Sequence, residues 1–112
     1  MDVVVNLEDG IVVLREPKDT RSFALRIAGP ADASSESHTE HLARVLEATG
    51  VGRLGPDGDA FVVADAVRFM AAGQVDEGWD EQFESMVSYA GTKGWLDDRG
   101  AIQAHVAWPR DG

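Results

Sequence analysis

Two β-branched, apolar runs at the start of the chain constrain its fold more than any other feature. Residues 3–7 and 11–14 flank Glu8, Asp9 and Gly10, and Gly10 can adopt the positive φ that a tight turn needs. This pattern predicts a β-hairpin. Because both runs are apolar at nearly every position, we expect the hairpin to be covered on more than one face, by a helix or by a second chain.

Four later segments are predicted to be strands. Residues 22–28 and 101–108 alternate apolar and polar side chains, which is typical of half-buried strands. Residues 51–54 and 60–63 flank a Gly-Pro-Asp-Gly-Asp turn and predict a second, shorter hairpin. We expect the last strand to lie beside part of the N-terminal strands.

Three other segments have the apolar spacing of helices. The first is 38–49, with Ser37 as the predicted N-cap. A short helix capped by Asp65 follows, and the third and most regular segment is 76–93, with Gly94 as its predicted left-handed terminator.

The order of these elements indicates the fold class. Strands and helices do not alternate strictly, which favours an α+β fold over a doubly wound parallel sheet. With 112 residues, the chain can build one core and is too short for two. We therefore predict a single domain, 1–112, that forms a two-layer sandwich. Its mainly antiparallel sheet (an N-terminal meander plus the C-terminal strand) would pack against two or three helices.

Composition excludes several classes of partner. The chain carries 20 Asp and Glu against 10 Lys and Arg, a net charge of −10, so we expect it to repel nucleic acid. It has no cysteine, which excludes disulfides, thiolate nucleophiles and cysteine-based metal sites. No basic leader or long apolar run is present, so we expect a cytoplasmic protein with no membrane partner.

Four polar side chains are candidate ligand-binding residues: His38, His41, Arg26 and His105. His38 and His41 lie one helical turn apart and could share a metal ion. Their spacing is one residue short of the metalloprotease pattern, so we expect surface positions and no metal. His105 shares its strand face with Gln103, so the alternation predicts that it lies on the polar side of the sheet.

No motif assigns a catalytic residue or a cofactor. The Gly-x-Gly-x-x-Gly spacing of residues 50–55 follows a predicted helix, whereas a dinucleotide site must follow a strand. No Gly-x-Ser-x-Gly motif is present. Residues 3–17 resemble the opening hairpin of crotonase-type enzymes, but the chain is far too short for that fold and lacks its glycine-rich oxyanion segment. The resemblance therefore implies no activity and no site residue.

Two functional hypotheses remain open. The first is a non-enzymatic subunit that binds another protein or forms a homodimer, through the N-terminal hairpin or an open sheet edge. It is based on the doubly apolar strands and on Trp79, Trp95 and Trp108, although these three rings could equally complete one core. The alternative is a small enzyme or ligand-binding domain with a polar pocket between sheet and helices.

Overall fold

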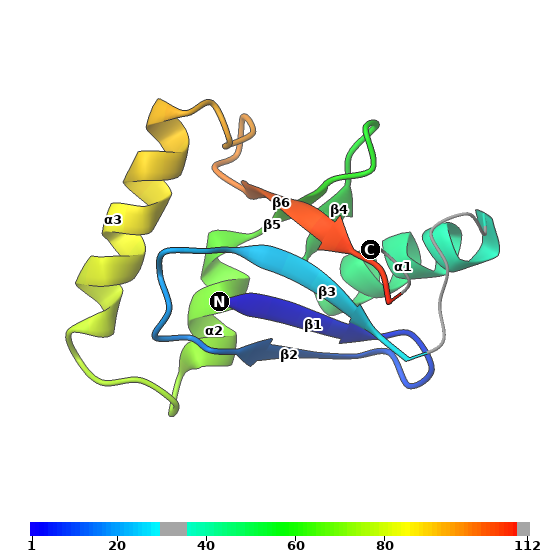
Figure 1. Ribbon diagram of the computed structural model, residues 1–112, viewed down its shortest axis with the longest axis horizontal. Helices are drawn as coiled ribbons and strands as arrows, with labels where there is room; N and C mark the ends of the chain where they lie inside the picture. The colour runs from blue at the N-terminus through cyan, green and yellow to red at the C-terminus, as the bar shows by residue number, and fades with distance from the viewer. Residues whose placement is uncertain (30–35, 110–112) are drawn as a thin grey trace.

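The fold is a six-stranded sheet curled into a half-barrel and accompanied by three helices (Figure 1). The structure is a computed structural model, and it describes residues 1–29 and 36–109. The strands are β1 (Asp2–Asn6), β2 (Ile11–Arg15), β3 (Ala24–Ala28), β4 (Gly52–Leu54), β5 (Ala60–Val62) and β6 (Ile102–Ala107). The helices are α1 (Glu36–Thr49), α2 (Ala64–Ala71) and α3 (Trp79–Thr92). In Figure 1, α1 and α2 lie behind the sheet, and α3 stands beyond the end at which β1 begins.

The sheet is mixed, so the prediction of a mainly antiparallel two-layer sandwich is wrong. Its strand order is β2-β1-β3-β6-β5-β4. Strand β3 is parallel to both β1 and β6, whereas the pairs β1–β2, β4–β5 and β5–β6 are antiparallel. The predicted meander fails because β3 pairs with β1 and not with β2. The last strand does lie beside an N-terminal strand, because β6 pairs with β3.

The loop between β2 and β3 explains the parallel pairing. It returns to the start of β1, where the Met1 amino group donates hydrogen bonds to the carbonyl oxygens of Asp19 and Ser22, both at 3.0 Å. The Ala24 N–H then donates to the Met1 carbonyl oxygen at 3.2 Å. Strand β3 therefore begins at the same end of the sheet as β1 and runs in the same direction.

Alternation along the strands places one face of the sheet in the core. Val3 and Val5 of β1 are fully buried, and the register aligns them with Leu25 and Ile27 of β3. The helices cover this face with the buried side chains Leu42, Val45 and Leu46 of α1, Val67 and Ala71 of α2, and Trp79, Phe83 and Ala90 of α3. Trp79 is therefore a core residue, whereas Trp95 is 45% exposed.

The C-terminal ends of the helices agree with the sequence, since α1 ends at Thr49 as predicted and positive-φ glycines follow all three helices, whereas the predicted N-terminal caps do not. Gly94 has a φ of 76°, and the Trp95 N–H donates to the Ala90 carbonyl oxygen at 2.9 Å, which completes the predicted Schellman ending. The predicted caps are wrong. Ser37 lies inside α1, which starts at Glu36, and Asp65 lies in the first turn of α2, after the N-cap Val63.

Arg68 joins α2 to α3. Its guanidinium lies 2.9 Å from the carboxylate of Asp65 and 4.0 Å from that of Asp80, and it also contacts Glu84. It lies over the Phe83 ring, 5.0 Å from the centroid. This cluster fixes α3 as a wall beside the sheet. All three helices fall short of the length and hydropathy that crossing a bilayer requires.

Candidate functional site

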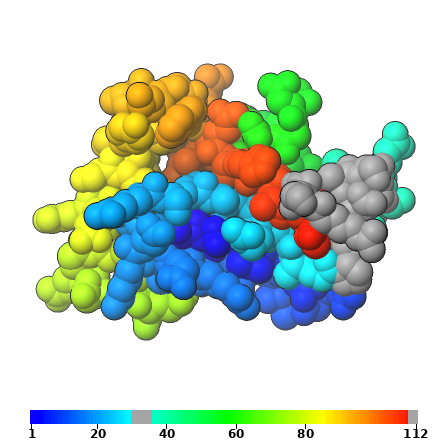
Figure 2. All heavy atoms as spheres, in the orientation of Figure 1, coloured from blue at the N-terminus to red at the C-terminus, as the bar shows by residue number. Residues whose placement is uncertain are grey.

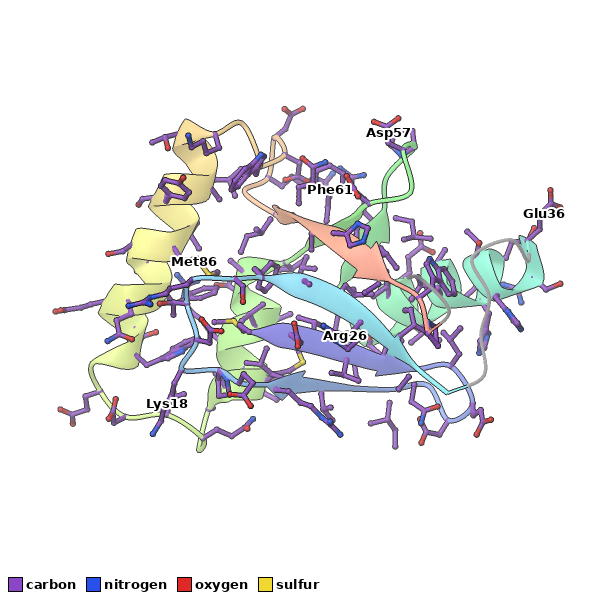
Figure 3. All side chains as sticks on the ribbon, in the orientation of Figure 1. Lys18, Arg26, Glu36, Asp57, Phe61 and Met86 are labelled. Atoms are coloured by element: carbon purple, nitrogen blue, oxygen red, sulfur yellow. The ribbon has the colours of Figure 1, made fainter. Side chains whose placement is uncertain are left out.

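A groove of about 840 Å³ separates α3 from strand β6 and from the loop that precedes β3. Figure 2 shows a notch at this place, between the yellow helix and the orange strand. The side chain of Met86 extends from α3 toward the start of β3 (Figure 3) and lines the groove together with Phe23 and Ile102. One wall and part of the floor are therefore apolar.

Two aromatic rings form the upper end of this groove. Tyr89 and Trp95 meet edge to face, with centroids 6.0 Å apart and planes at 73°. The Lys93 ammonium lies 5.5 Å from the Tyr89 ring centroid. Both backbone polar groups of Trp95 are hydrogen-bonded. Its N–H donates to the Ala90 carbonyl oxygen of α3, and its carbonyl oxygen accepts the Gln103 N–H at 2.7 Å. The Trp95 backbone is thus fixed between α3 and β6.

Polar side chains of β6 line the floor. Gln103 donates a hydrogen bond from its amide Nε2 to the Asp59 carboxylate at 2.7 Å. His105 lies two residues further along the same face of β6. Thus the structure places His105, predicted from sequence as a ligand-binding candidate, in a groove between sheet and helix.

Arg26 lies on the same sheet face as His105 but outside the groove lining. The β3–β6 register pairs Ala24 with His105 and Arg26 with Ala107, so the two candidates are diagonal neighbours. Arg26 instead forms an ion pair with Asp2 at 3.5 Å, on the side of the sheet that faces the viewer in Figure 3.

His38 and His41 lie at the start of α1, beside the β1–β2 turn and away from the groove. The Nε2 atom of His41 donates a hydrogen bond to the Leu7 carbonyl oxygen at 2.7 Å. This bond occupies one of the two ring nitrogens that could ligate a metal. Within residues 1–29 and 36–109, no three histidine or acidic side chains are grouped so as to hold a metal ion.

The groove residues that sequence reasoning missed include Arg21, Tyr89, Gln103 and Asp59. Gln103 and Asp59 are 44 positions apart and meet only because β5 pairs with β6. The sequence signal that could have located the aromatic end of the groove was Gly94. The helix ending that Gly94 predicts also determines where Trp95 leaves α3.

A second polar cluster lies beside the turn that precedes β6. The Arg53 guanidinium is 3.1 Å from the Asp97 carboxylate and stacks over the Phe61 ring at 4.4 Å. Desolvation opposes ionisation of Asp97. However, the N–H groups of Ala101 and Arg99 and the Arg53 guanidinium together lower the pKa of Asp97 below its usual value. The cluster is an anchor for the turn that precedes β6.

The two open edges of the sheet differ in character. Strand β4 has three residues, with the charged Arg53 at its centre. Its Gly52 lies too close to β5 for any side chain, since a Cβ added there would be 2.1 Å from the Phe61 carbonyl oxygen. Strand β2 has five residues, with Val13 at its centre. Short strands and central charges protect an edge from pairing with another chain. The β2 edge therefore lacks the protection that a short strand and a central charge give to the β4 edge.

The β2 edge leaves apolar side chains exposed to solvent. Val13, Val4 and Arg26 are register partners on the sheet face opposite the core. Val4, between β2 and β3, is 8% exposed, whereas Val13, with a neighbour on one side, is 43% exposed. Ile11 on the same edge is 56% exposed.

No family model matches the chain, and neither a curated protein nor a solved structure matches it. The β2 edge and the groove between α3 and β6 are therefore the features of the molecule that bear on its function.

Proposed function

We propose that the chain is a self-associating subunit, and that two copies form a homodimer by antiparallel pairing of their β2 strands. The observation that supports this proposal is the unprotected edge at β2: five residues long, with Val13 at its centre, in a sheet whose other edge is short and charged. A two-fold pairing would join two six-stranded sheets into one, with the same surface serving both subunits.

Charge and side-chain pattern favour a register centred on Val13. In this register Val13 lies opposite its own copy, and Arg15 lies opposite Ile11 and diagonal to Asp9 of the other copy. Arg15 is the single charged residue within β2. It would therefore approach an acidic turn, while the strand centres meet as an apolar pair.

The energetics predict a weak dimer. Covering the exposed parts of Ile11 and Val13 would contribute on the order of 1–2 kcal/mol per side chain. A contact limited to edge strands lies at the low end of interface sizes. The net charge of −10 on each copy also opposes association. We therefore expect dissociation in the micromolar range and tighter association at high salt, where the repulsion is screened.

The test is sedimentation velocity, supported by light scattering, over a range of protein concentrations and at low and high salt. The key variant is Val13→Lys, which places a charge at the centre of the edge. Its matched control is Val63→Lys, because Val63 is 40% exposed but lies at the start of α2, away from β2. We expect the wild type and Val63→Lys to approach twice the 12.0 kDa chain mass, and Val13→Lys to remain monomeric.

Two results would overturn the proposal. One is a wild-type mass of a single chain at high micromolar concentration in both salts. The other is a dimer that Val13→Lys leaves as tight as Val63→Lys does, because the contact would then lie elsewhere.

A further inference from the structure

The groove between α3 and β6 has the size of a small-molecule site. Its volume of about 840 Å³ lies within the roughly 300–1,000 Å³ of typical ligand pockets. Apolar and aromatic side chains form its walls, and a few polar groups converge on it from β6 and from the loop before β3. This combination is typical of sites that bind a planar organic molecule and fix its orientation.

The aromatic wall is exposed, although the backbone of Trp95 is fixed. Trp95 is 45% exposed and Tyr89 is 56% exposed. The Schellman ending of α3 and the bond from Gln103 fix the Trp95 backbone. A ring that stacks here would displace water from two aromatic surfaces, and the fixed Trp95 backbone reduces the ordering that binding requires.

The groove lacks the acidic excess of the whole chain, because its lining holds one arginine and one carboxylate. Its lining includes one carboxylate, that of Asp59, which already accepts a hydrogen bond from Gln103. Arg21 and His105 also line it. Neither side chain is in direct ion-pair contact with a carboxylate among the described residues, although the Asp19 carboxylate, which accepts the Arg21 backbone N–H, interacts with the Arg21 charge at longer range. Lys93 adds a positive charge beside Tyr89. In a chain with twice as many acids as bases, a groove that offers the Arg21 guanidinium and the His105 ring, with Lys93 nearby and its one carboxylate already hydrogen-bonded, is complementary to an anion.

We infer that this groove is a binding site for a small aromatic carboxylate. The ring would lie against Trp95, Tyr89 and Met86, and the carboxylate would accept hydrogen bonds from Arg21 and His105. An aromatic cation fits the charges less well, because the Lys93 ammonium already lies over the Tyr89 ring and would repel it. This binding function is separate from self-association, because β2 contributes no residue to the groove.

Two probes with one ring and opposite charge test the inference: indole-3-acetate and tryptamine. Nitrogen-15 NMR of the labelled chain reports on three indole N–H groups at once. Trp95 lies in the groove, Trp79 is buried with its N–H bonded to the Pro17 carbonyl oxygen, and Trp108 lies outside the lining. We expect indole-3-acetate to move the Trp95 signal with saturation and to leave the Trp79 and Trp108 signals in place. Tryptamine should bind at least about tenfold more weakly.

Matched arginine variants locate the carboxylate. Arg21→Gln should weaken binding of indole-3-acetate by about tenfold. Arg26→Gln removes an arginine that lies on the same sheet face as His105 but outside the groove, and it should leave binding unchanged. The inference is overturned if tryptamine binds as tightly as indole-3-acetate, or if the Trp95 signal does not move with either probe. Equal effects of Arg21→Gln and Arg26→Gln would also overturn it.

Discussion

Truncation of Phe83 tests whether α3 is anchored in the core as the structure describes. Phe83 is fully buried, stacks on Trp79 with ring centroids 4.9 Å apart, and lies beneath the Arg68 guanidinium. Replacing a buried phenylalanine by alanine costs about 3–5 kcal/mol. The lost ring stack alone accounts for about 0.5–1.5 kcal/mol of this, so we expect Phe83→Ala to lie in the upper half of that range.

Urea unfolding measures the effect. With an m value of about 1.5–2 kcal/mol per molar urea, the midpoint should fall by roughly 2–3 M. The experiment is run at protein concentrations well below the dimer dissociation constant, because dimerisation would otherwise add to the apparent stability. If Phe83→Ala does not fold, Phe83→Leu should still fold, with a loss of about 1–2 kcal/mol.

Phe69 supplies the matched control. It is the same residue type on the neighbouring helix α2 but is 84% exposed. Phe69→Ala should change the free energy of unfolding by no more than about 0.5 kcal/mol. Equal losses for Phe83→Ala and Phe69→Ala, or an unchanged midpoint for Phe83→Ala, would refute the placement of α3.

Three further predictions concern charged groups. Arg68→Met should lower stability by about 1 kcal/mol at low salt and by less at high salt, because the lost contacts are ionic; equal losses in urea unfolding at both salts would contradict this. The pKa of Asp97 is lowered in the folded state, so its stabilisation is complete above the unfolded-state value near 3.9 and is lost as pH falls through the folded-state value. Asp97→Asn should therefore flatten the acid limb of a stability–pH profile, and an identical limb would count against the assignment. Calorimetry should detect no zinc binding tighter than about 10 µM, because His38 and His41 supply two ligands at most; stoichiometric zinc that His41→Ala abolishes would disprove this.

Local chemistry was the part of the fold that the sequence could predict. The β1–β2 hairpin follows from the turn chemistry of Gly10 between two β-branched runs. The end of α3 follows from Gly94. Each depends on interactions between residues a few positions apart, which side-chain pattern and backbone conformation determine almost alone.

Strand order could not be predicted in the same way. The parallel pairing of β3 with β1 depends on hydrogen bonds from Met1 to Asp19 and Ser22, 18 and 21 positions away. An alternating strand pattern is the same whether the strand pairs on one side of a hairpin or on the other. A connection that simply follows the chain would have placed β3 beside β2.

The groove was predicted only in outline. A pocket between sheet and helices was one of two open hypotheses, and of its four candidate residues the structure brings His105 into the groove. The spacing of His38 and His41 was visible, but the bond from His41 to Leu7 spans 34 positions and has no signature in sequence. Contacts of this kind depend on the assembled fold.

Cysteine cross-linking at Val13 tests the proposed β2 pairing most directly. The chain has no cysteine, so any disulfide in a single-cysteine variant must join two copies. In a register centred on Val13, the two copies of that residue face each other with Cα atoms about 4.5–5.5 Å apart, within the range that a disulfide accepts. The two copies of Ile11 would be roughly 14 Å apart, too far to bridge. Under mild oxidation we expect Val13→Cys to form covalent dimers rapidly, and Ile11→Cys and Val63→Cys to remain monomers on a non-reducing gel. Equal cross-linking of all three variants, or none at Val13→Cys, would contradict pairing through β2.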